Sequence, residues 1–282
     1  MRRVRFKRLL PVCLCLLLTS CSNAFVYNQL DWLIPWYMGD YVNLTRDQKK
    51  SLKQELQPLL QWHREEELES YLVILEGIES DLEDPIDAAV IKDWADELLL
   101  AYARLEDRSL DLAFTLGEQM SDAQLADFMG ELYEEQADLE EEYLGRTDAE
   151  FREQTFENFE DSLKSFMGKL QPEQKQLLQE AAADMYRFDE AWLQQRRKWL
   201  VQTEEVLERE PGWQQRARDI LDQRESHQSE QYVAANVHNE QVIYQVLAAV
   251  IDSRNDKQDR RVRKELGGFK RDLNKLIARE KS

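Results

Sequence analysis

The sequence predicts an all-α protein, an elongated bundle of about seven to nine helices with short connections. Three observations support this class. Glycine and proline are scarce, with 9 and 6 among 282 residues. The Val-Ile-Thr alternation that is typical of strands is almost absent, and apolar residues instead return every three or four positions. Apolar residues make up 43% of the chain, which excludes an intrinsically disordered composition.

The first element is a leader. Residues 1–8 carry five positive charges, and the apolar run that follows, 9–18, is too short to span a bilayer. This order predicts a secretory signal peptide over residues 1–20. The end of the leader, Leu18-Thr19-Ser20-Cys21, resembles the bacterial lipobox. The resemblance implies cleavage before Cys21, thioether lipidation of its sulfur and acylation of its amino group, with palmitate as the expected acyl group. The alternative is ordinary cleavage that leaves Cys21 as a free thiol.

Lipidation of Cys21 would fix the location of the protein. Cys13 and Cys15 leave with the leader, so the mature chain has no disulfide framework and no thiolate metal site. Several acyl chains exceed the two signals that stable anchoring requires. Ser22 stands where an aspartate tends to retain such lipoproteins at the inner membrane. The sequence therefore predicts an outer-membrane lipoprotein that faces the periplasm.

The charge is unevenly distributed. Loss of residues 1–20 takes the net charge from −19 to −24, which makes nucleic acid a poor partner. The C-terminal segment 254–282 is basic, with 11 Lys and Arg against 5 Asp and Glu. It is expected to lie against the acidic helices of the same chain, and the alternative partner is an anionic lipid surface.

An aromatic segment, residues 25–41, follows the anchor directly. Its candidate surface residues are Trp32, Trp36, Tyr37 and Tyr41. Only three residues separate Cys21 from this segment, and they reach about 10 Å when extended. One interpretation is an interfacial aromatic belt or a docking surface. The other is a first helix that packs onto the body as part of the core, and Leu30, Leu33 and Ile34 favour it.

The body 21–282 is predicted to be a single all-α domain. A run at near-heptad spacing predicts a helix-on-helix seam between Leu178 and Val206. Pro58 should kink or divide its helix. Breaks are expected at five further points, namely Pro85, Gly145, Pro172, Pro211-Gly212 and Gly267-Gly268.

One short pattern recurs three times. Its residues are Leu44, Thr45 and Gln48, then Ser121 and Gln124 after Met120, then Gln174 after Leu170-Gln171-Pro172. Each predicts a helix start, where a hydroxyl caps the N3 amide and the glutamine reaches back to the amide of the cap. Proline in the third copy suits the first helical position.

Two family resemblances follow from these residues. The recurring pattern resembles the LTxxQ motif of the Spy and CpxP type of periplasmic helical chaperones and stress regulators, which implies a chaperone-like role. A capping box is also a general helix start, so a purely structural role stays open. Residues 27–48 after the lipobox look like an uncharacterised lipoprotein family of Gram-negative bacteria with a domain-of-unknown-function label, which implies no catalytic residues.

Acidic clusters are the remaining candidates for chemistry. They comprise Glu65, Glu66, Glu67 and Glu69, and then Glu134, Glu135, Asp138, Glu140, Glu141 and Glu142. His63, His227 and His238 lack the helical spacing of a carboxylate–histidine metal site. A solvated acidic face is therefore expected, with no metal and no cofactor. Arg196, Arg197 and Lys198 are expected to flank a core seam as snorkelling side chains.

The sequence thus favours a non-enzymatic envelope adaptor or chaperone-like factor with a protein partner. The alternative is a metal-binding protein or hydrolase whose carboxylates converge from several helices.

Overall fold

The computed structural model describes residues 26–224, 226 and 228–278. The predicted all-α class is confirmed for these residues. The helices are α3 Leu30–Met38, α4 Arg46–Trp62, the π-helical turn η1 His63–Glu67, α5 Leu68–Asp81, α6 Ala88–Gln119, α7 Asp122–Leu144, α8 Asp148–Met167, α9 Pro172–Asp184, α10 Asp189–Leu207, α11 Trp213–Asp222, α12 Glu230–Asp252 and α13 Asp256–Ala278. Counted with α4, η1 and α5 as one continuous helix, the described part has ten helices, slightly more than expected.

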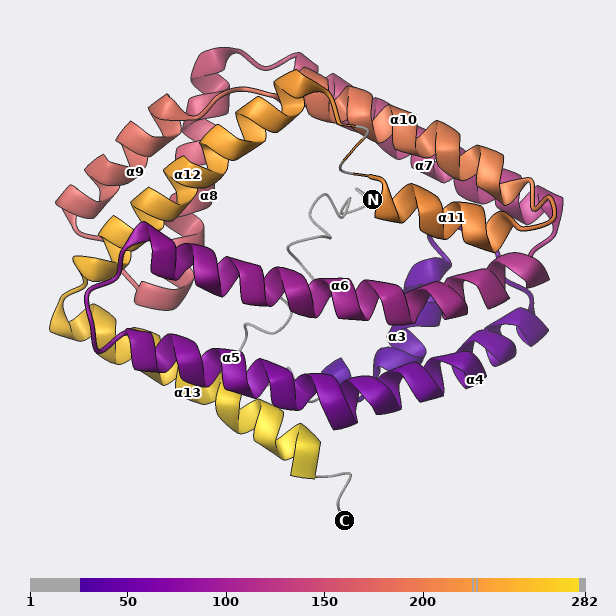
Figure 1. Cartoon of the computed structure of the whole chain (residues 1–282), viewed down its shortest axis with the longest axis horizontal. Helices are drawn as coiled ribbons and strands as arrows, with labels where there is room; N and C mark the ends of the chain where they lie inside the picture. Colours follow the sequence, from indigo (N-terminus) through magenta and orange to yellow (C-terminus); the bar gives the residue numbers. More distant parts are fainter. Residues whose placement is uncertain (1–25, 225, 227, 279–282) are drawn as a thin grey trace, which may run out of the picture.

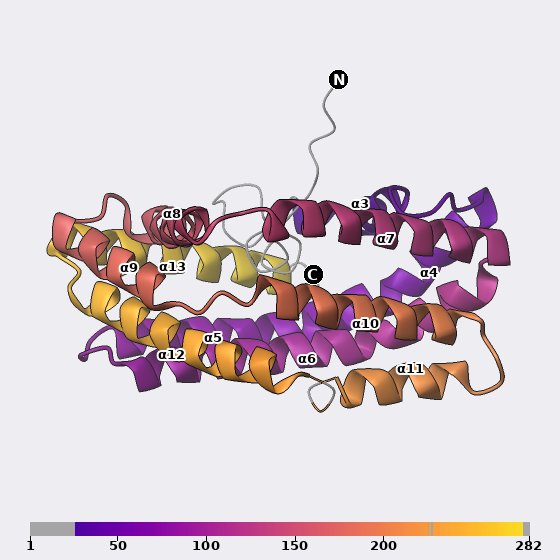
Figure 2. The same cartoon turned by 90° about the horizontal axis from the view of Figure 1, so that it is seen from above.

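Viewed down the shortest axis of the molecule, the helices form a closed circuit (Figure 1). The α4–η1–α5 helix runs the length of one edge, and α6 returns beside it. Seen from above, α3, α7, α8 and α13 lie toward one broad side, and α11 and α12 toward the other (Figure 2). The starts of α4 and α7 meet at one end of the molecule, and the starts of α9 and α13 meet at the other (Figure 1).

At the first of these ends, Gln48 and Gln124 form a reciprocal amide pair, the first junction. Gln48 Nε2 donates to Gln124 Oε1 at 2.9 Å, and Gln124 Nε2 donates to Gln48 Oε1 at 2.8 Å. Each amide also donates to a backbone carbonyl, of Gln119 and Asn43 respectively. Each Oε1 accepts a second bond from its own helix cap. Both carboxamides thereby use two donors and two acceptors, so the helix starts are tied together with full hydrogen bonding.

At the opposite end, Gln174 and Gln258 form the second junction in the same way. Gln258 Nε2 donates to Gln174 Oε1 at 2.8 Å, and Gln174 Nε2 donates back at 3.2 Å. Gln258 also donates to the carbonyl of Lys169, three residues before the start of α9, as Gln124 does to Asn43, three residues before the start of α4. The Asn255 side chain caps α13 by accepting from the backbone amide of Gln258, and the backbone amide of Asn255 donates to Gln258 Oε1. The pattern therefore occurs four times, not three.

Helix packing repeats along with the junctions. Helix α7, which starts at the first junction, packs on α10, and α13, which starts at the second, packs on α5. Helices α3 and α8 pack on α4 and α9, the helices that follow them, and α6 packs on α12. The three copies visible in the sequence show no sign of a repeat, because Gln48, Gln124 and Gln174 lie 76 and then 50 residues apart, which matches no simple duplication. The structure shows two equivalent halves, α3–α7 and α8–α13. The last helix of each half, α7 or α13, packs against the other half.

The core consists of separate clusters along this circuit. Leu52 and Leu56 belong to the cluster behind the first junction, and Leu178 and Val250 belong to the cluster behind the second. Leu56, Leu178 and Val250 have no exposed surface. The apolar residue four positions after each of Gln48 and Gln174 thus points into the core, as the motif predicts.

Some predicted breaks differ in the structure. Helix α13 continues through Gly267 and Gly268, so that expected break is wrong. Gly268 is buried in the same turn as Leu266 and Phe269, and burial of this apolar face offsets the low helix propensity of the two glycines. Helix α4 is not divided at Pro58 either, and a π-helical turn follows at His63–Glu67.

The run between Leu178 and Val206 is divided between α9 and α10. Buried Asn239 of α12 bonds the backbone of Tyr186 on both sides, accepting from its amide at 2.8 Å and donating to its carbonyl at 2.9 Å. These backbone groups are then not available to a continuous helix.

The basic C-terminal segment lies against acidic residues of the same chain. Arg263 pairs with Glu83 at 2.7 Å, Lys270 pairs with Glu79, and Arg254 donates to the carbonyl of Leu82. These contacts fasten α13 along α5. Two partners were expected for this segment, the chain's own acidic helices or an anionic lipid surface, and the structure shows contacts with the chain's own helices.

Candidate functional site

The aromatic segment divides into an outward and an inward set. Trp32 and Trp36 are 57% and 60% exposed, and their rings stack with centroids 6.1 Å apart. Tyr37 and Tyr41 are half-buried and share a hydrogen bond of 2.9 Å, and Tyr41 packs near Phe128. Burial raises the pKa of the Tyr37 phenol, and the bond to Tyr41 raises it further. The surface interpretation therefore fits the two tryptophans, and the core interpretation fits the two tyrosines.

The helical period explains this division. Ile34 and Met38 of α3 pack into the core cluster behind the first junction. Trp32 and Trp36, four residues apart, project from the opposite face of the same short helix. Lys53 of α4 pairs with Asp31 at 2.9 Å and fixes α3 on the flank of α4. The exposure of this tryptophan pair thus follows from how α3 is seated.

Cys21 and Phe25 lie outside the described residues. The description begins at Val26, five residues after Cys21, a span of at most about 18 Å for an extended chain. Within the part of the chain that the structure describes, no helix is long and apolar enough to cross a membrane.

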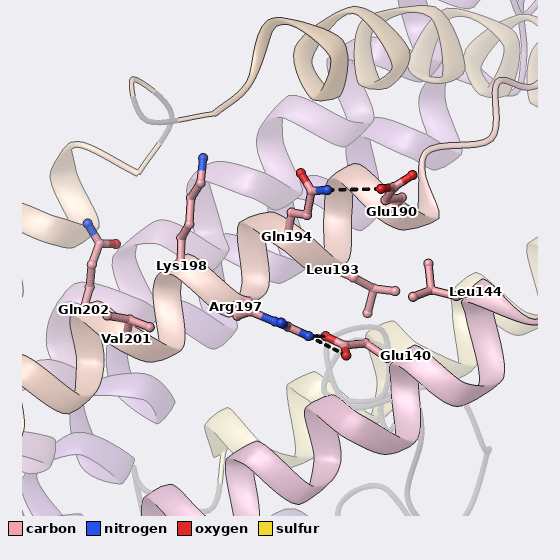
Figure 3. A pocket seen from close by; sticks show the side chains of 9 residues that line it. All are labelled: Glu140, Leu144, Glu190, Leu193, Gln194, Arg197, Lys198, Val201 and Gln202. Carbon is pink, nitrogen blue, oxygen red and sulfur yellow. Dashed lines mark hydrogen bonds and ion pairs between the residues drawn. The ribbon is translucent and has the colours of Figure 1, made fainter.

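An open groove of about 870 Å³ lies between α7 and α10, the α7–α10 groove (Figure 3). Leu144 of α7 and Leu193 of α10 point toward each other across it, and Val201 extends its apolar surface along α10 (Figure 3). Leu193 is buried, whereas Leu144 and Val201 are 49% and 45% exposed. The remaining lining residues are Glu140, Glu190, Gln194, Arg197, Lys198 and Gln202.

Ion pairs hold the two walls of the groove at a fixed separation. Arg197 donates to Glu140 at 2.5 Å, and Arg196 donates to Glu135 at 2.7 Å. Buried Gln136 accepts from Arg196 at 2.9 Å and donates to the carbonyl of Leu193. These contacts bond the heads of Arg196 and Arg197 on α10 to carboxylates and an amide of α7, a more specific role than snorkelling. The groove combines a preformed apolar floor with a charged rim, which suits an amphipathic ligand.

The equivalent helix pair in the other half, α5 and α13, is covered. Tyr27 and Leu30 pack there against Leu68, Leu273 and Leu276, and we call this the covered edge. The Tyr27 hydroxyl lies 2.9 Å from His63 Nδ1, and the other ring nitrogen of His63 lies 3.2 Å from the Tyr71 hydroxyl. Burial lowers the pKa of His63 from 6.5 to about 4, so the ring is neutral at pH 7. A neutral ring can accept one of these bonds and donate the other.

The acidic clusters are partly structural. Glu67 is 3% exposed and receives two bonds from Arg104, at 2.7 and 2.9 Å. The expected solvated face is therefore wrong for Glu67, because the η1 turn directs this carboxylate toward α6. Among the described residues, no group of three or more His, Cys, Asp or Glu side chains is placed to hold a metal ion.

The predicted capping residues serve the fold. Thr45, Gln48, Ser121 and Gln124 form two complete capping boxes, Leu44 is buried, and the amide of Gln171 donates to Gln174 Oε1 at 2.9 Å. Sequence reasoning missed the fourth copy. Asn255, Gln258 and Val262 keep its spacing, and only the preceding Arg254 breaks the apolar pattern.

Comparison with known proteins adds one match. A model of a family of unknown function, DUF6279, matches residues 40–233, from just before α4 to the start of α12. The match includes the first junction, Gln174 and the α7–α10 groove. Comparison with curated proteins and with solved structures finds no match. Because the family model covers more than half of the chain, this protein belongs to the DUF6279 family of unknown function.

Proposed function

We propose that the protein is a lipoprotein, anchored through Cys21 in the outer membrane and facing the periplasm, that binds an apolar segment of another polypeptide in the α7–α10 groove. The observation that carries this proposal is the contrast between the α7–α10 groove and the covered edge, its equivalent in the other half. The chain covers one edge with its own residues Tyr27 and Leu30, while Leu144 and Val201 stay exposed on the other.

The comparison of edges also indicates the chemistry of the ligand. The covered edge binds a short segment through an aromatic and an aliphatic side chain. A partner segment with apolar residues at helical spacing could bind the α7–α10 groove in the same manner, with its polar residues at the rim. The lipobox at Cys21 and the LTxxQ-like motifs support an envelope location and an adaptor or chaperone-like role.

Photo-crosslinking in intact cells tests the proposal. A photoreactive residue replaces Val201 or Leu144 in the groove, and a matched probe replaces Val73 of α5, which is 67% exposed. One discrete product at the groove positions alone would identify an adaptor, and many products at the same positions would identify a chaperone. Equal products from Val73, or no product from the groove, would overturn the proposal.

The anchor is tested separately. Labelled palmitate should enter the wild-type chain and should be lost in Cys21→Ser. Retention of the label in Cys21→Ser would contradict lipidation at this residue without bearing on the groove.

A further inference from the structure

The tryptophan pair adjoins a basic surface that the acidic composition of the chain makes unusual. Helix α4 carries four basic side chains near its start, Arg46, Lys49, Lys50 and Lys53. All four are exposed, and their spacing of three, four and seven residues places them on one face of the helix. We call this the basic face of α4.

One contact relates the basic face to the tryptophan pair. Lys53 pairs with Asp31 at 2.9 Å, so the basic face lies on the flank of α4 where α3 is seated. Trp32 and Trp36 project from α3 on the side opposite its partly buried residues Ile34 and Met38. Two exposed, stacked indole rings of α3 therefore lie on the flank of α4 that carries the row of cations.

We propose that the tryptophan pair and the basic face of α4 form a membrane-contact surface, which seats the domain on anionic phospholipid headgroups. Indole rings partition to the boundary between headgroups and acyl chains. Lysine and arginine beside them are attracted to anionic lipid at close range. This combination distinguishes a bilayer from a polypeptide partner, since an apolar protein surface would not require a row of cations.

The position of the anchor supports a bilayer as the ligand. This inference rests on the proposed lipidation of Cys21, which lies 11 residues before Trp32 in the sequence. At most about 18 Å of extended chain joins Cys21 to Val26, so a lipid on Cys21 keeps α3 close to the bilayer. The surface adds a second contact to the anchor. Two contacts restrict the tilt of the domain, and the orientation of the α7–α10 groove becomes fixed relative to the membrane.

Fluorescence quenching tests the surface directly. The lipidated mature chain is reconstituted in vesicles of phosphatidylcholine and phosphatidylglycerol that contain a brominated phosphatidylcholine, and quenching of tryptophan emission is measured. We expect Trp32→Ala/Trp36→Ala to lose most of the quenching. The matched control is Trp199→Ala, which removes a 38% exposed tryptophan of α10 and should leave the quenching intact.

The basic face has its own test. Lys49→Gln/Lys50→Gln/Lys53→Gln should reduce quenching severalfold, and added salt should reproduce the loss in the wild type. The control Arg260→Gln/Lys264→Gln/Arg271→Gln removes the same charge from exposed positions of α13 and should have no effect. Equal quenching in Trp32→Ala/Trp36→Ala and the wild type would overturn the membrane-contact surface.

A failure of lipidation would be distinguishable, because labelled palmitate would then not enter the wild-type chain. In that case the Cys21→Ser chain, floated with phosphatidylglycerol vesicles, decides the matter. Flotation that depends on Trp32 and Trp36 supports the surface, and absent flotation, or flotation that does not depend on them, overturns it.

Discussion

The helix pairs α5–α13 and α7–α10 are equivalent in the two halves of the molecule, but one pair is covered by other residues of the chain and the other is open. At α5 and α13, Tyr27 and Leu30 cover the apolar side chains, and His63 bonds the Tyr27 hydroxyl. At α7 and α10, Leu144 and Val201 remain exposed in a groove of about 870 Å³. The junctions behind these edges share the same pattern of amide bonds. The comparison teaches that the repeated framework serves stability, and that the unrepeated parts are where function should be sought.

The largest effect should come from matched core truncations, which test whether the halves are equivalent. Leu52→Ala and Leu178→Ala each remove a buried side chain four residues after a junction glutamine. Each should lower the free energy of unfolding by about 3–4 kcal/mol, since the cavity adds to the lost burial. Urea denaturation measures both. A difference of more than about 2 kcal/mol between them would show that the halves are not energetically equivalent.

The covered edge should respond to pH through His63. Its folded-state pKa, about 4, lies below the ordinary value of 6.5. Between these values the unfolded chain binds a proton that the folded chain does not. The contribution of the neutral His63 ring to the free energy of unfolding is therefore complete above pH 6.5, and about 3 kcal/mol of it is lost as the pH falls toward 4.

Denaturation curves at several pH values check this response. The difference between the wild type and His63→Gln should shrink as the pH falls from 7 to 4. If the free energy of unfolding of His63→Gln fell with pH as steeply as that of the wild type, His63 would not be the cause.

The junctions should differ in the cost of losing one glutamine. Gln174 is 1% exposed, whereas Gln124 is half-buried at the surface. Gln174→Ala removes one hydrogen bond from each polar atom of the buried Gln258 amide and the bonds to the carbonyls of Val250 and Ser253, which should cost about 3 kcal/mol. Gln124→Ala should cost about 1 kcal/mol, because water can replace its bonds. The order would be contradicted if urea denaturation showed Gln124→Ala to be the more destabilising.

The smallest effect on stability should come from the tryptophan pair. Trp32→Ala/Trp36→Ala removes mostly exposed side chains, so the midpoint of unfolding should change little, by about 0.5 kcal/mol or less for each substitution. Thermal unfolding of the unlipidated chain measures this. A large loss would mean that the pair supports α3, and the quenching experiment would then need Trp→Phe variants.

The sequence was sufficient for the fold class and for the local helix starts. The helical period and the scarcity of glycine and proline predict an all-α chain, and Thr45, Ser121 and Pro172 mark where helices begin. These signals are local, because capping and amphipathicity depend on residues within a few positions of one another. They say nothing about which helix starts meet.

The pairing of the motifs is a long-range fact and escaped the sequence. Gln174 meets Gln258 only after the chain has folded back, and the fourth copy lacks the apolar residue that marks the others. Glu67 looks like a solvated residue of a charged stretch, and the η1 turn buries it. The α7–α10 groove likewise depends on two helices far apart in the sequence.

Binding of the apolar dye 8-anilinonaphthalene-1-sulfonate tests the contrast between the two edges most directly. The wild-type chain should show one saturable site, which Leu144→Gln/Val201→Thr removes and the exposed control Leu99→Gln/Leu100→Gln leaves unchanged. Tyr27→Ala/Leu30→Ala should uncover the other edge and add a second site, with circular dichroism confirming that the helices persist. Dye binding that Leu144→Gln/Val201→Thr does not alter would contradict the assignment of the α7–α10 groove as the open site.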